Sequence, residues 1–392
     1  MPERGQTAIL YVAPRFPARS ETFVYREWLG LAARGHAMHS VTLRRADPLD
    51  DARLDAMAAE AVVAYRAATL PHLLIGLLAH PGLAFRALRE ACDPRIESVK
   101  GRLKYLVQAG AGIALGHRLA RRGIRHVHAH FSHAPATVAL YIARYLGTRF
   151  SFTGHAADLF RDRAALALKL DAADAVLCIS HWHWDFYRGL GAAEGKLHLV
   201  RCAVDIPDAV TVADSGPILC VARLVPKKGV DLLLTAFARL PGEPRLTIIG
   251  DGPQRDALEA QAVLLGVADR VAFLGARGHE DVLAAMDQCR LFVLPSRIAA
   301  DGDRDGIPVV LMEAMARARP VIAGDLEAIR ELVPPGAGIL VPPDDADALT
   351  TALATLLGDT THAMALAGRD HVRREFATAI NLDRFEEAAL GG

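Results

Sequence analysis

The sequence lacks net charge, paired cysteines and any long apolar run. Its 392 residues include 45 Lys or Arg and 45 Asp or Glu, so the formal charge is zero. A protein that coats nucleic acid needs a basic excess to neutralise phosphates, and this composition excludes that class. The five cysteines are odd in number and show no CxxC spacing, so we expect buried reduced thiols and no disulfide framework. They are Cys92, Cys178, Cys202, Cys220 and Cys289.

The most apolar stretch, residues 70–85, contains two prolines and two histidines. It falls short of the about 20 apolar residues that a membrane span requires. The apolar residues 9–12 are too few for the core of a signal peptide, and Arg15 follows soon after. We therefore expect a cytoplasmic protein, with peripheral contact at the inner face of the plasma membrane left open.

What the sequence does have is a 52% hydrophobic and 23% charged composition, which is typical of a packed globular protein. Short apolar runs alternate with longer amphipathic stretches, and the alternation predicts parallel sheets covered by helices on both faces. The pattern occurs twice, so we predict an α/β protein with two doubly wound, Rossmann-like domains. The expected strands are residues 7–13, 40–43, 126–129, 150–153 and 175–179, then 217–221, 245–249, 270–274, 291–294, 320–323 and 338–341. The expected helices are residues 21–34, 137–146 and 164–172, then 230–239, 253–265, 281–287, 309–317 and 346–357.

The best domain boundary is the aperiodic segment 205–217, which contains two prolines. Residues 1–212 carry 27 basic and 19 acidic side chains, a net charge of +8, while residues 213–392 carry 18 and 26, a net charge of −8. Of the 16 histidines, 13 lie in the first half. We expect a first domain of residues 1–206 and a second of 207–375, with a C-terminal helix at about 376–392 as a candidate to pack back on the first. Residues 46–125 are expected to be a helical excursion within the first domain.

Two short motifs in the second half suit an anionic ligand. Arg223 and Lys228 follow an apolar strand and precede a helix, where cations beside a helix N-terminus favour anion binding. The alternative is a solvated basic loop. Further on, residues 250–253 form a Gly-Asp-Gly-Pro turn between a strand and a helix. The third glycine of a dinucleotide fingerprint is missing, so a plain strand–helix turn remains the alternative for Gly252.

A longer segment, residues 294–316, combines a strand, a polar loop rich in Gly and Asp, and an apolar helix. Asp305 stands just before the expected helix and Glu313 about two turns inside it. Backbone N–H groups near Gly306 would face an anionic ligand, and the carboxylates could accept hydrogen bonds from sugar hydroxyls. The alternatives are a helix cap for Asp305 and a surface position for Glu313. However, Glu313 lies in an apolar run, where a carboxylate needs a partner.

This segment resembles the acidic signature of the retaining glycosyltransferases of family 4, usually Glu-Gly-x-Pro followed by Glu-Ala-Met-Ala. The Arg223–Lys228 pair and the 250–253 turn match the same family in order and distance. In the first half, residues 16–23, 128–131 and 152–158 are similar to the branch that makes bacterial exopolysaccharides, including the colanic-acid type. The resemblance implies a GT-B fold, in which two Rossmann-like domains face each other across a cleft.

The resemblance also implies roles for individual residues. Arg223 and Lys228 would bind the nucleotide diphosphate and stabilise the leaving group, so that no metal or other cofactor is needed. Glu313 would hold the ribose, and Asp305, with the N–H groups of Gly306 and Ile307, would hold the donor sugar. His155 would contact the transferred sugar. The donor set also includes Gly252 and Pro295, and the acceptor side would include Ser20, Glu21 and His130.

The implied reaction moves a sugar from a nucleotide-diphosphate donor to a glycan or polyprenyl-linked acceptor, with retention of configuration. Four arginines suit contact with an anionic membrane leaflet or, alternatively, belong to an ordinary solvated helix: Arg118, Arg121, Arg122 and Arg125. Two departures from the family pattern are Asp305 in place of Glu and Ala318 in place of Gly. They keep a non-catalytic sugar-nucleotide-binding relative as an alternative, beside a GT-B epimerase or phosphorylase.

The histidines of the first half offer a competing interpretation as a metal site. His126, His128 and His130 alternate on an expected strand and so face one side together. With His133 they could suggest zinc, but no nearby Asp, Glu or Cys closes the set. Polar lining of the cleft between the two expected domains is the favoured interpretation, and no metal is expected.

Overall fold

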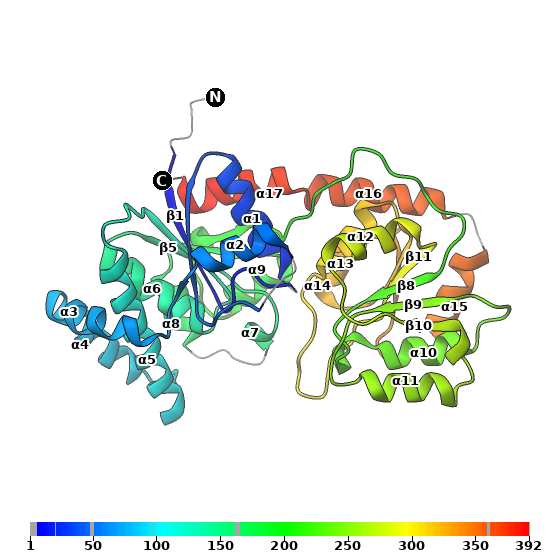
Figure 1. Cartoon of the computed structure of the whole chain (residues 1–392), viewed down its shortest axis with the longest axis horizontal. Coiled ribbons are helices and arrows are strands. Elements are labelled where there is room, and N and C mark those ends of the chain that lie inside the picture. The colour runs from blue at the N-terminus through cyan, green and yellow to red at the C-terminus, as the bar shows by residue number, and fades with distance from the viewer. Residues whose placement is uncertain are drawn as a thin grey trace. The chain divides into compact units, whose positions relative to one another are not determined.

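The computed structural model describes residues 6–19, 21–47, 51–96, 98–160, 165–358 and 361–391. The chain forms two compact units (Figure 1). The first comprises Met1–Arg201 and Asn381–Gly392, and the second comprises Cys202–Ile380. Each unit contains one parallel sheet covered by helices, which is the doubly wound α/β architecture that the sequence predicts.

The first unit is built on seven parallel strands in the order β3-β2-β1-β4-β5-β6-β7. Their bounds are Ala8–Ala13 (β1), Ala37–Thr42 (β2), Val62–Val63 (β3), His126–His130 (β4), Arg149–Thr153 (β5), Ala175–Cys178 (β6) and Leu197–Leu199 (β7). Strand β1, in the interior of the sheet, is fully buried from Ile9 onward, as expected for a strand with helices on both faces.

The helices that cover this sheet are α1 (Thr22–Ala33), α2 (Ala52–Glu60), α6 (Ala134–Leu146), α7 (Ala157–Phe160), α8 (Leu166–Ala172) and α9 (His181–Gly189). The helical excursion contains three more: α3 (Leu70–Ala79), α4 (Pro81–Ala91) and α5 (Val99–Leu119). Helix α5 packs closely on α6, because a Cβ placed on Gly112 would lie 2.5 Å from the Cβ of Tyr141. The excursion is not purely helical, since Val62 and Val63 join the sheet as β3.

The C-terminal segment packs on β1 and α1 of the first unit. Helix α17 (Thr378–Phe385) leads into a π-helical turn at Glu386–Leu390. Phe385 and Leu382 belong to the same buried cluster as Ile9 and Tyr11. A Cβ on Gly30 of α1 would lie 2.5 Å from a methyl group of Leu382, so the two helices touch closely there.

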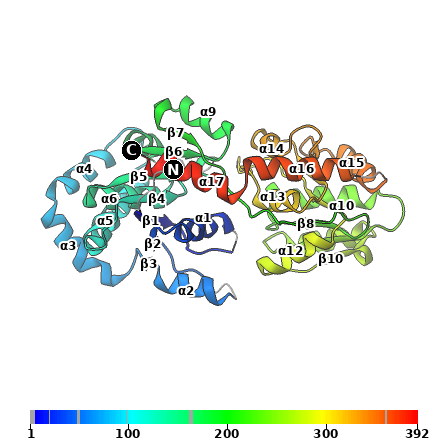
Figure 2. The same ribbon diagram turned by 90° about the horizontal axis from the view of Figure 1, so that it is seen from above.

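The second unit has six parallel strands in the order β10-β9-β8-β11-β12-β13 (Figure 2 shows the sheet from above). Their bounds are Ile218–Val221 (β8), Leu246–Ile249 (β9), Val271–Phe273 (β10), Leu291–Leu294 (β11), Val321–Gly324 (β12) and Ile339–Val341 (β13). Its helices are α10 (Val230–Ala238), α11 (Arg255–Leu264), α12 (His279–Gln288), α13 (Val309–Ala316), α14 (Glu327–Leu332), α15 (Ala346–Gly358) and α16 (His362–Glu375).

In both sheets the strand order reverses once. The chain moves outward in one direction from β1 and from β8, then returns to the centre at β4 and at β11. Doubly wound sheets bind ligands beyond the carboxyl ends of their strands at such a reversal. Ligand sites are therefore expected at the carboxyl ends of β1 and β4 and at those of β8 and β11. We call these two places the β1/β4 edge and the β8/β11 edge.

One expectation about the cysteines is wrong. Four of the five are buried, as predicted, but Cys92 is exposed. It is the C-cap residue of α4, on the same side of that helix as the exposed Phe85 and Leu88, so its side chain reaches solvent.

Candidate functional site

In the second unit, two glycines allow the loop after β8 to pack against the turn after β9. A Cβ on Gly252 would lie 2.5 Å from the carbonyl oxygen of Leu224, and one on Gly250 would lie 1.8 Å from that of Ala222. Gly250 also has a φ of 135°, which side chains disfavour. The glycines of this turn thus have a packing role: they fix the loop that carries Arg223.

Asp305 lies at the centre of a buried polar cluster at the β8/β11 edge. Lys228 Nζ donates to Asp305 Oδ2 at 2.7 Å, and Ser296 Oγ donates to the same oxygen at 2.6 Å. Lys227 Nζ is 3.5 Å from Asp305 Oδ1. Burial alone would raise the pKa of Asp305, but the charges of Lys228 and Lys227 and the two hydrogen bonds lower it below its usual value. Asp305 is therefore a carboxylate held in place by cations.

The sequence alternative of a helix cap for Asp305 is wrong. Pro308 occupies the N-cap position of α13, and the Asp305 carboxylate faces Lys228 and Ser296 instead. The second lysine, Lys227, donates to Asp303 Oδ1 at 3.1 Å. These ion pairs tie the loop after β8 to the polar loop before α13, so both are ordered around Asp305.

Glu313 is buried inside α13 with 4% of its surface exposed, which excludes the alternative of a surface helix position. His279, the first residue of α12, brings its Nε2 to 3.8 Å from Glu313 Oε1. His279 is thus a polar partner for this carboxylate, which a buried charge among apolar side chains requires.

Arg223 differs from the other cations of this edge. It is exposed, and it forms no ion pair with another residue in the described ranges. Three further residues of the predicted donor set are buried: Gly306 and Ile307, which follow Asp305 in the chain, and Pro295, which follows β11. A Cβ on Gly229 would lie 2.2 Å from the Pro295 carbonyl oxygen, so the loop carrying Lys228 rests directly on the end of β11.

In the first unit, His155 lies just beyond the end of β5. Its backbone N–H donates to Asp158 Oδ1 at 3.1 Å, and the N–H of Ser132 donates to Asp158 Oδ2 at 2.7 Å. Asp158 therefore ties together the segments that follow β4 and β5. The His155 ring packs against Phe23 and Phe131, with centroid distances of 4.6 and 4.8 Å.

His155 is the last member of a series of hydrogen-bonded side chains that begins with Glu27 on α1. Glu27 Oε1 lies 3.2 Å from His130 Nε2, and His130 Nδ1 lies 3.1 Å from His155 Nε2. Tyr11 OH also donates to Glu27 Oε1. If the carboxylate accepts from His130 Nε2–H, then His130 Nδ1 is an acceptor, and His155 must place its proton on Nε2. Nδ1 of His155 is then the nitrogen with a lone pair.

Three imidazoles of this edge, those of His126, His128 and His155, are neutral. Burial, together with the nearby His130 and other histidines, holds the pKa of His155 well below its usual value. Burial likewise lowers the pKa of His128, and that of His126 to about 3. The group is consequently a set of uncharged hydrogen-bonding side chains at physiological pH.

The structure corrects one argument against a metal site. Glu27, which the sequence analysis did not consider, offers a carboxylate oxygen within 4.8 Å of ligand nitrogens on His128 and His130. However, His128 Nδ1 is 2.7 Å from Ser151 Oγ, and its Nε2 is 3.2 Å from Thr153 Oγ1. Both nitrogens are thus engaged within the protein, and the group is better explained as a hydrogen-bonded network.

The remaining predicted residues are less central. Glu21 is the half-buried N-cap residue of α1, without a capping hydrogen bond from its side chain. Ser20 lies outside the described residues. Ala318, which follows α13, is fully buried with a φ of 52°, so an alanine occupies a left-handed position suited to glycine.

Sequence reasoning missed Glu27, Lys227, Ser296 and His279. Two of them could have been found from the sequence, because Ser296 follows Pro295 and Lys227 precedes Lys228, and both of those neighbours were in the predicted site. Glu27 and His279 gave no signal beyond their residue type, since each contacts the site from a helix distant in sequence.

Comparison with known proteins places this geometry in a family. The family model described as "Glycosyltransferase Family 4" matches residues 20–207, and that described as "Glycosyl transferases group 1" matches residues 216–359. Together they cover most of both units. The chain belongs to the family 4 glycosyltransferases.

Among curated proteins, the chain is similar to a putative colanic acid biosynthesis glycosyltransferase, WcaL, of Salmonella typhimurium. The two are 32% identical over 215 residues, which is 52% of this chain and 53% of the relative. It is also similar to a GDP-mannose-dependent monoacylated phosphatidylinositol monomannoside mannosyltransferase of Corynebacterium glutamicum, 34% identical over 44% of this chain and 46% of the relative. The match thus spans about half the length of these curated relatives.

Solved structures show the same fold over nearly the whole chain. Anabaena HepE in complex with UDP has a TM-score of 0.72 at 18% identity, covering 97% of this chain and 99% of its own. The lipopolysaccharide outer core galactosyltransferase WaaB has a TM-score of 0.69 at 19% identity, covering 98% and 99%. The fold is therefore GT-B, as the sequence analysis expected.

Proposed function

We propose that this chain is a retaining glycosyltransferase that moves a sugar from a nucleotide-diphosphate donor to a glycan or lipid-linked acceptor in polysaccharide biosynthesis. The observation that carries the proposal is the Asp305 cluster. A carboxylate, Asp305, and a cation, Lys228, are fixed together at the β8/β11 edge, and Arg223 is exposed on the same loop as Lys228. The relatives with printed roles in colanic acid and mannoside synthesis support the same class.

The chemistry needs this arrangement. When the bond between the sugar and the diphosphate breaks, negative charge develops on the leaving phosphate oxygen. Cations fixed in advance stabilise that charge without reorganising during the reaction. One N–H of the Lys228 ammonium donates a hydrogen bond to Asp305, and the other two can donate to the diphosphate. Arg223 offers a planar fork that suits phosphate oxygens. Asp305 would accept hydrogen bonds from the donor sugar, and Glu313 from the ribose.

On the first unit we assign His155 to the transferred sugar, with His130 and Glu21 on the acceptor side. Glu27 is a positioning residue, because it acts on His155 through His130. A neutral imidazole can accept from or donate to a sugar hydroxyl without adding charge. We also propose that transfer needs no metal, because Arg223 and Lys228 supply the positive charge, and that the protein works in the cytoplasm.

A donor screen tests the proposal. The purified chain is incubated with UDP- and GDP-linked sugars and lipid-linked acceptors, with and without EDTA, and products are detected by mass spectrometry. We expect transfer from one donor class, unaffected by EDTA, with the anomeric configuration of the donor kept in the product. Nucleotide binding without turnover on any donor would favour a non-catalytic relative. Restoration of a lost activity by a divalent ion would refute metal independence, and inversion would refute retention.

A further inference from the structure

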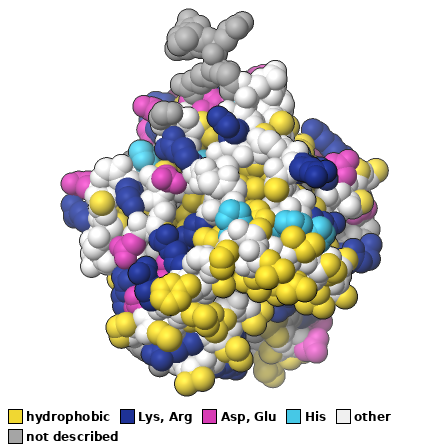
Figure 3. All heavy atoms as spheres, turned by 90° about the vertical axis from the view of Figure 1, so that its left-hand side faces the viewer, with side chains coloured by type: hydrophobic (Ala, Val, Ile, Leu, Met, Phe, Trp, Pro, Cys, Tyr) yellow, Lys and Arg dark blue, Asp and Glu magenta, His cyan; other side chains and the backbone are white. Residues whose placement is uncertain are grey.

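The surface of α3, α4 and the first half of α5 is unusually apolar for a folded protein. Large hydrophobic side chains on these helices are between 48% and 82% exposed. They are Leu70, Leu74, Ile75, Leu78, Phe85, Leu88, Val99, Leu103 and Val107. Figure 3 shows hydrophobic side chains gathered over the lower part of this face, with Lys and Arg side chains beside them. We call these nine residues the apolar face. Exposed apolar patches of this kind mark interaction sites.

Helix α3 turns its small side inward and its large side outward. A Cβ on Gly76 would lie 3.0 Å from Ile113 of α5, so α3 meets α5 at a glycine. Leu74 and Leu78, two positions away on either side, are 64% and 74% exposed. An ordinary amphipathic helix buries its leucines, whereas α3 exposes three of its five.

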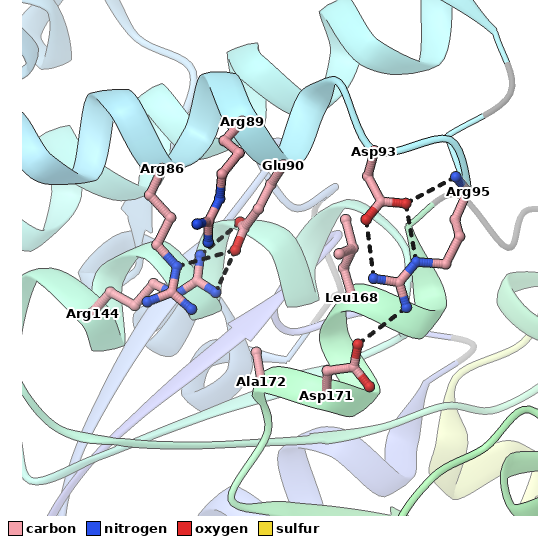
Figure 4. A pocket seen from close by; sticks show the side chains of 9 residues that line it. All are labelled: Arg86, Arg89, Glu90, Asp93, Arg95, Arg144, Leu168, Asp171 and Ala172. Carbon is pink, nitrogen blue, oxygen red and sulfur yellow. Dashed lines mark hydrogen bonds and ion pairs between the residues drawn. The ribbon is translucent and has the colours of Figure 1, made fainter.

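Helix α4 cannot rotate to hide its apolar side. Its Glu90 is buried and accepts hydrogen bonds from Arg144 at 2.8 and 2.9 Å, from Tyr141 at 2.7 Å and from Tyr105 at 2.8 Å. Figure 4 shows Glu90 between arginines in a pocket of about 450 Å³. Burial opposes ionisation of Glu90, but these partners lower its pKa to about 2. Phe85 lies on the other side of α4 from Glu90. The network around Glu90 therefore holds the helix with Phe85 facing solvent.

The charges beside the apolar face are basic. Residues 70–119 carry seven Lys or Arg and three Asp or Glu, and Glu90, one of the three, is buried in its network. On α5, the exposed Lys100 and Lys104 each follow a residue of the apolar face, Val99 and Leu103. Hydrophobic side chains with adjacent cations match an anionic bilayer, which offers acyl chains beneath phosphates.

We propose that the apolar face docks on an anionic lipid bilayer, with Lys100 and Lys104 at the headgroups and Leu74, Leu78 and Phe85 in the acyl boundary. The inference deepens the proposed function and rests on it for the reason to dock, since a lipid-linked acceptor lies in a membrane. A second copy of the chain is the less favoured occupant, because the same cations would face each other across the contact.

The helices suit docking on a membrane better than crossing it. In the part of the chain that the structure describes, no single helix is long and apolar enough to span a bilayer. The pair Ala67–Ala79 and Pro81–Ala91 reaches the required length and composition only together, with a bend of 99° between them. The arginines at residues 118–125, for which the sequence left membrane contact and a solvated helix as alternatives, lie in and after the last turn of α5, at its other end. Lys100 and Arg118 are separated by about 27 Å along the helix axis, at 1.5 Å per residue.

Co-sedimentation with vesicles tests the proposal. The full chain is mixed with vesicles of phosphatidylcholine alone or with phosphatidylglycerol added. We expect binding to the anionic vesicles that is weakened at least about tenfold by Leu74→Gln/Leu78→Gln/Phe85→Gln and by Lys100→Glu/Lys104→Glu. The matched controls are Val263→Gln/Leu264→Gln, on exposed apolar residues of α11, and Arg118→Glu/Arg121→Glu. Both controls should bind close to the parent. Circular dichroism checks that each variant is folded.

Cys92 gives a second readout, since it is the exposed cysteine among five and lies beside Phe85 and Leu88 on α4. An environment-sensitive dye on Cys92 should shift to shorter wavelength with anionic vesicles. No vesicle binding by the parent, or equal losses in the controls, would overturn the proposal. So would concentration-dependent dimers that only the apolar-face variants abolish. Calorimetry with UDP and GDP on the same variants separates the two claims, because a failure of docking leaves nucleotide binding intact.

Discussion

The two sheets share one strand pattern and differ in the chemistry at their carboxyl edges. At the β8/β11 edge the polar groups carry full charges, with Asp305 held by Lys228 and Lys227. At the β1/β4 edge burial keeps the imidazoles of His128 and His155 neutral, and His155 is in hydrogen-bond contact with His130. The topology thus decides where a site can form, and the residues decide what it can bind. Fixed charges suit a diphosphate, while neutral donors and acceptors suit sugar hydroxyls.

The largest expected effect is loss of charge at the β8/β11 edge. Lys228→Ala should lower kcat/KM by roughly 10²- to 10³-fold, the usual cost of removing one preorganised group that stabilises developing charge. It also leaves the buried Asp305 carboxylate without its closest cation, so the free energy of unfolding should fall by about 1–3 kcal/mol. Steady-state kinetics and denaturant unfolding measure the two effects.

The double variant Lys228→Met/Asp305→Asn separates these effects. It removes both charges, so much of the lost stability should return while activity stays low. Full activity in the double variant would show that the charged pair serves only the fold.

A smaller effect is expected at the neutral edge. His155→Ala should lower kcat by about 10- to 100-fold through a lost contact with the transferred sugar. Affinity for a nucleoside diphosphate should stay within about twofold of the parent, since the diphosphate binds the other unit. Turnover kinetics and calorimetry measure the two quantities. An unchanged rate would contradict the role of His155.

Glu27→Gln is the matched variant at the first member of the hydrogen-bonded series that ends at His155. It keeps the shape of the side chain and removes the charge that orients His130. Nitrogen NMR shifts should show a mixture of tautomers at His155 in place of the single Nε2–H form. The decrease in kcat should be smaller than the one that His155→Ala causes. An unchanged tautomer would show that Glu27 does not position the ring.

Acid should weaken the two units in different pH windows. An unfolded histidine titrates near pH 6.5, while the folded first unit holds the pKa of His126 at about 3 and lowers those of His128 and His155. Below about pH 6.5 the unfolded state therefore binds protons at these histidines while the folded state does not. The stability of the first unit should fall as the pH drops below about 6.5, by up to about 1.4 kcal/mol per pH unit for each histidine.

Asp305 loses its contribution in the same direction, on acidification, but at lower pH. Its pKa is lowered from 3.8, so its contribution is present above pH of about 4 and is lost as the pH falls through the lower folded value. Hydrogen exchange, corrected for intrinsic rates, should show loss of protection in the first unit before the second between pH 7 and pH 4.5. Simultaneous loss in both units would contradict the assignment, and His126→Gln should reduce the early loss.

The smallest expected effect concerns the left-handed alanine after α13. Ala318→Gly should raise the free energy of unfolding by about 0.5–1 kcal/mol, because glycine has no steric cost at a φ of 52°. Ala314→Gly, within α13, is the matched control and should lower stability by a similar amount. Thermal unfolding of both variants tests this, and a loss of stability in Ala318→Gly would contradict the strain.

Hydrophobic periodicity predicted most of the sheet strands, because buried parallel strands are short continuous apolar runs. It missed β3 and β7, of two and three residues, because runs that short are not distinguishable from loops. It placed residues 70–85 in a helical excursion and found them unsuited to a membrane span, but it did not predict that they are exposed. Apolar helices are usually buried, and nothing in the sequence shows that α3 packs through Gly76 and exposes Leu70, Leu74 and Leu78.

The site shows a similar limit. The sequence identified Lys228 and Asp305 separately, but the ion pair joins residues 77 positions apart. Glu27 resembles any acidic residue on an amphipathic helix until the fold places it beside His130. Residue type and local spacing can therefore nominate members of a site, while their partners depend on which strand ends meet at a sheet edge.

Calorimetric titration of the chain with UDP and GDP in EDTA tests the central claim most directly. The account predicts that one of the two binds at a single site, and that Lys228→Ala and Arg223→Ala each weaken binding by at least about tenfold. Arg245→Ala, an exposed arginine just before β9 at the opposite edge of the sheet, should bind like the parent. Equal affinity in the Lys228 and Arg223 variants and the parent would contradict a donor site at the β8/β11 edge.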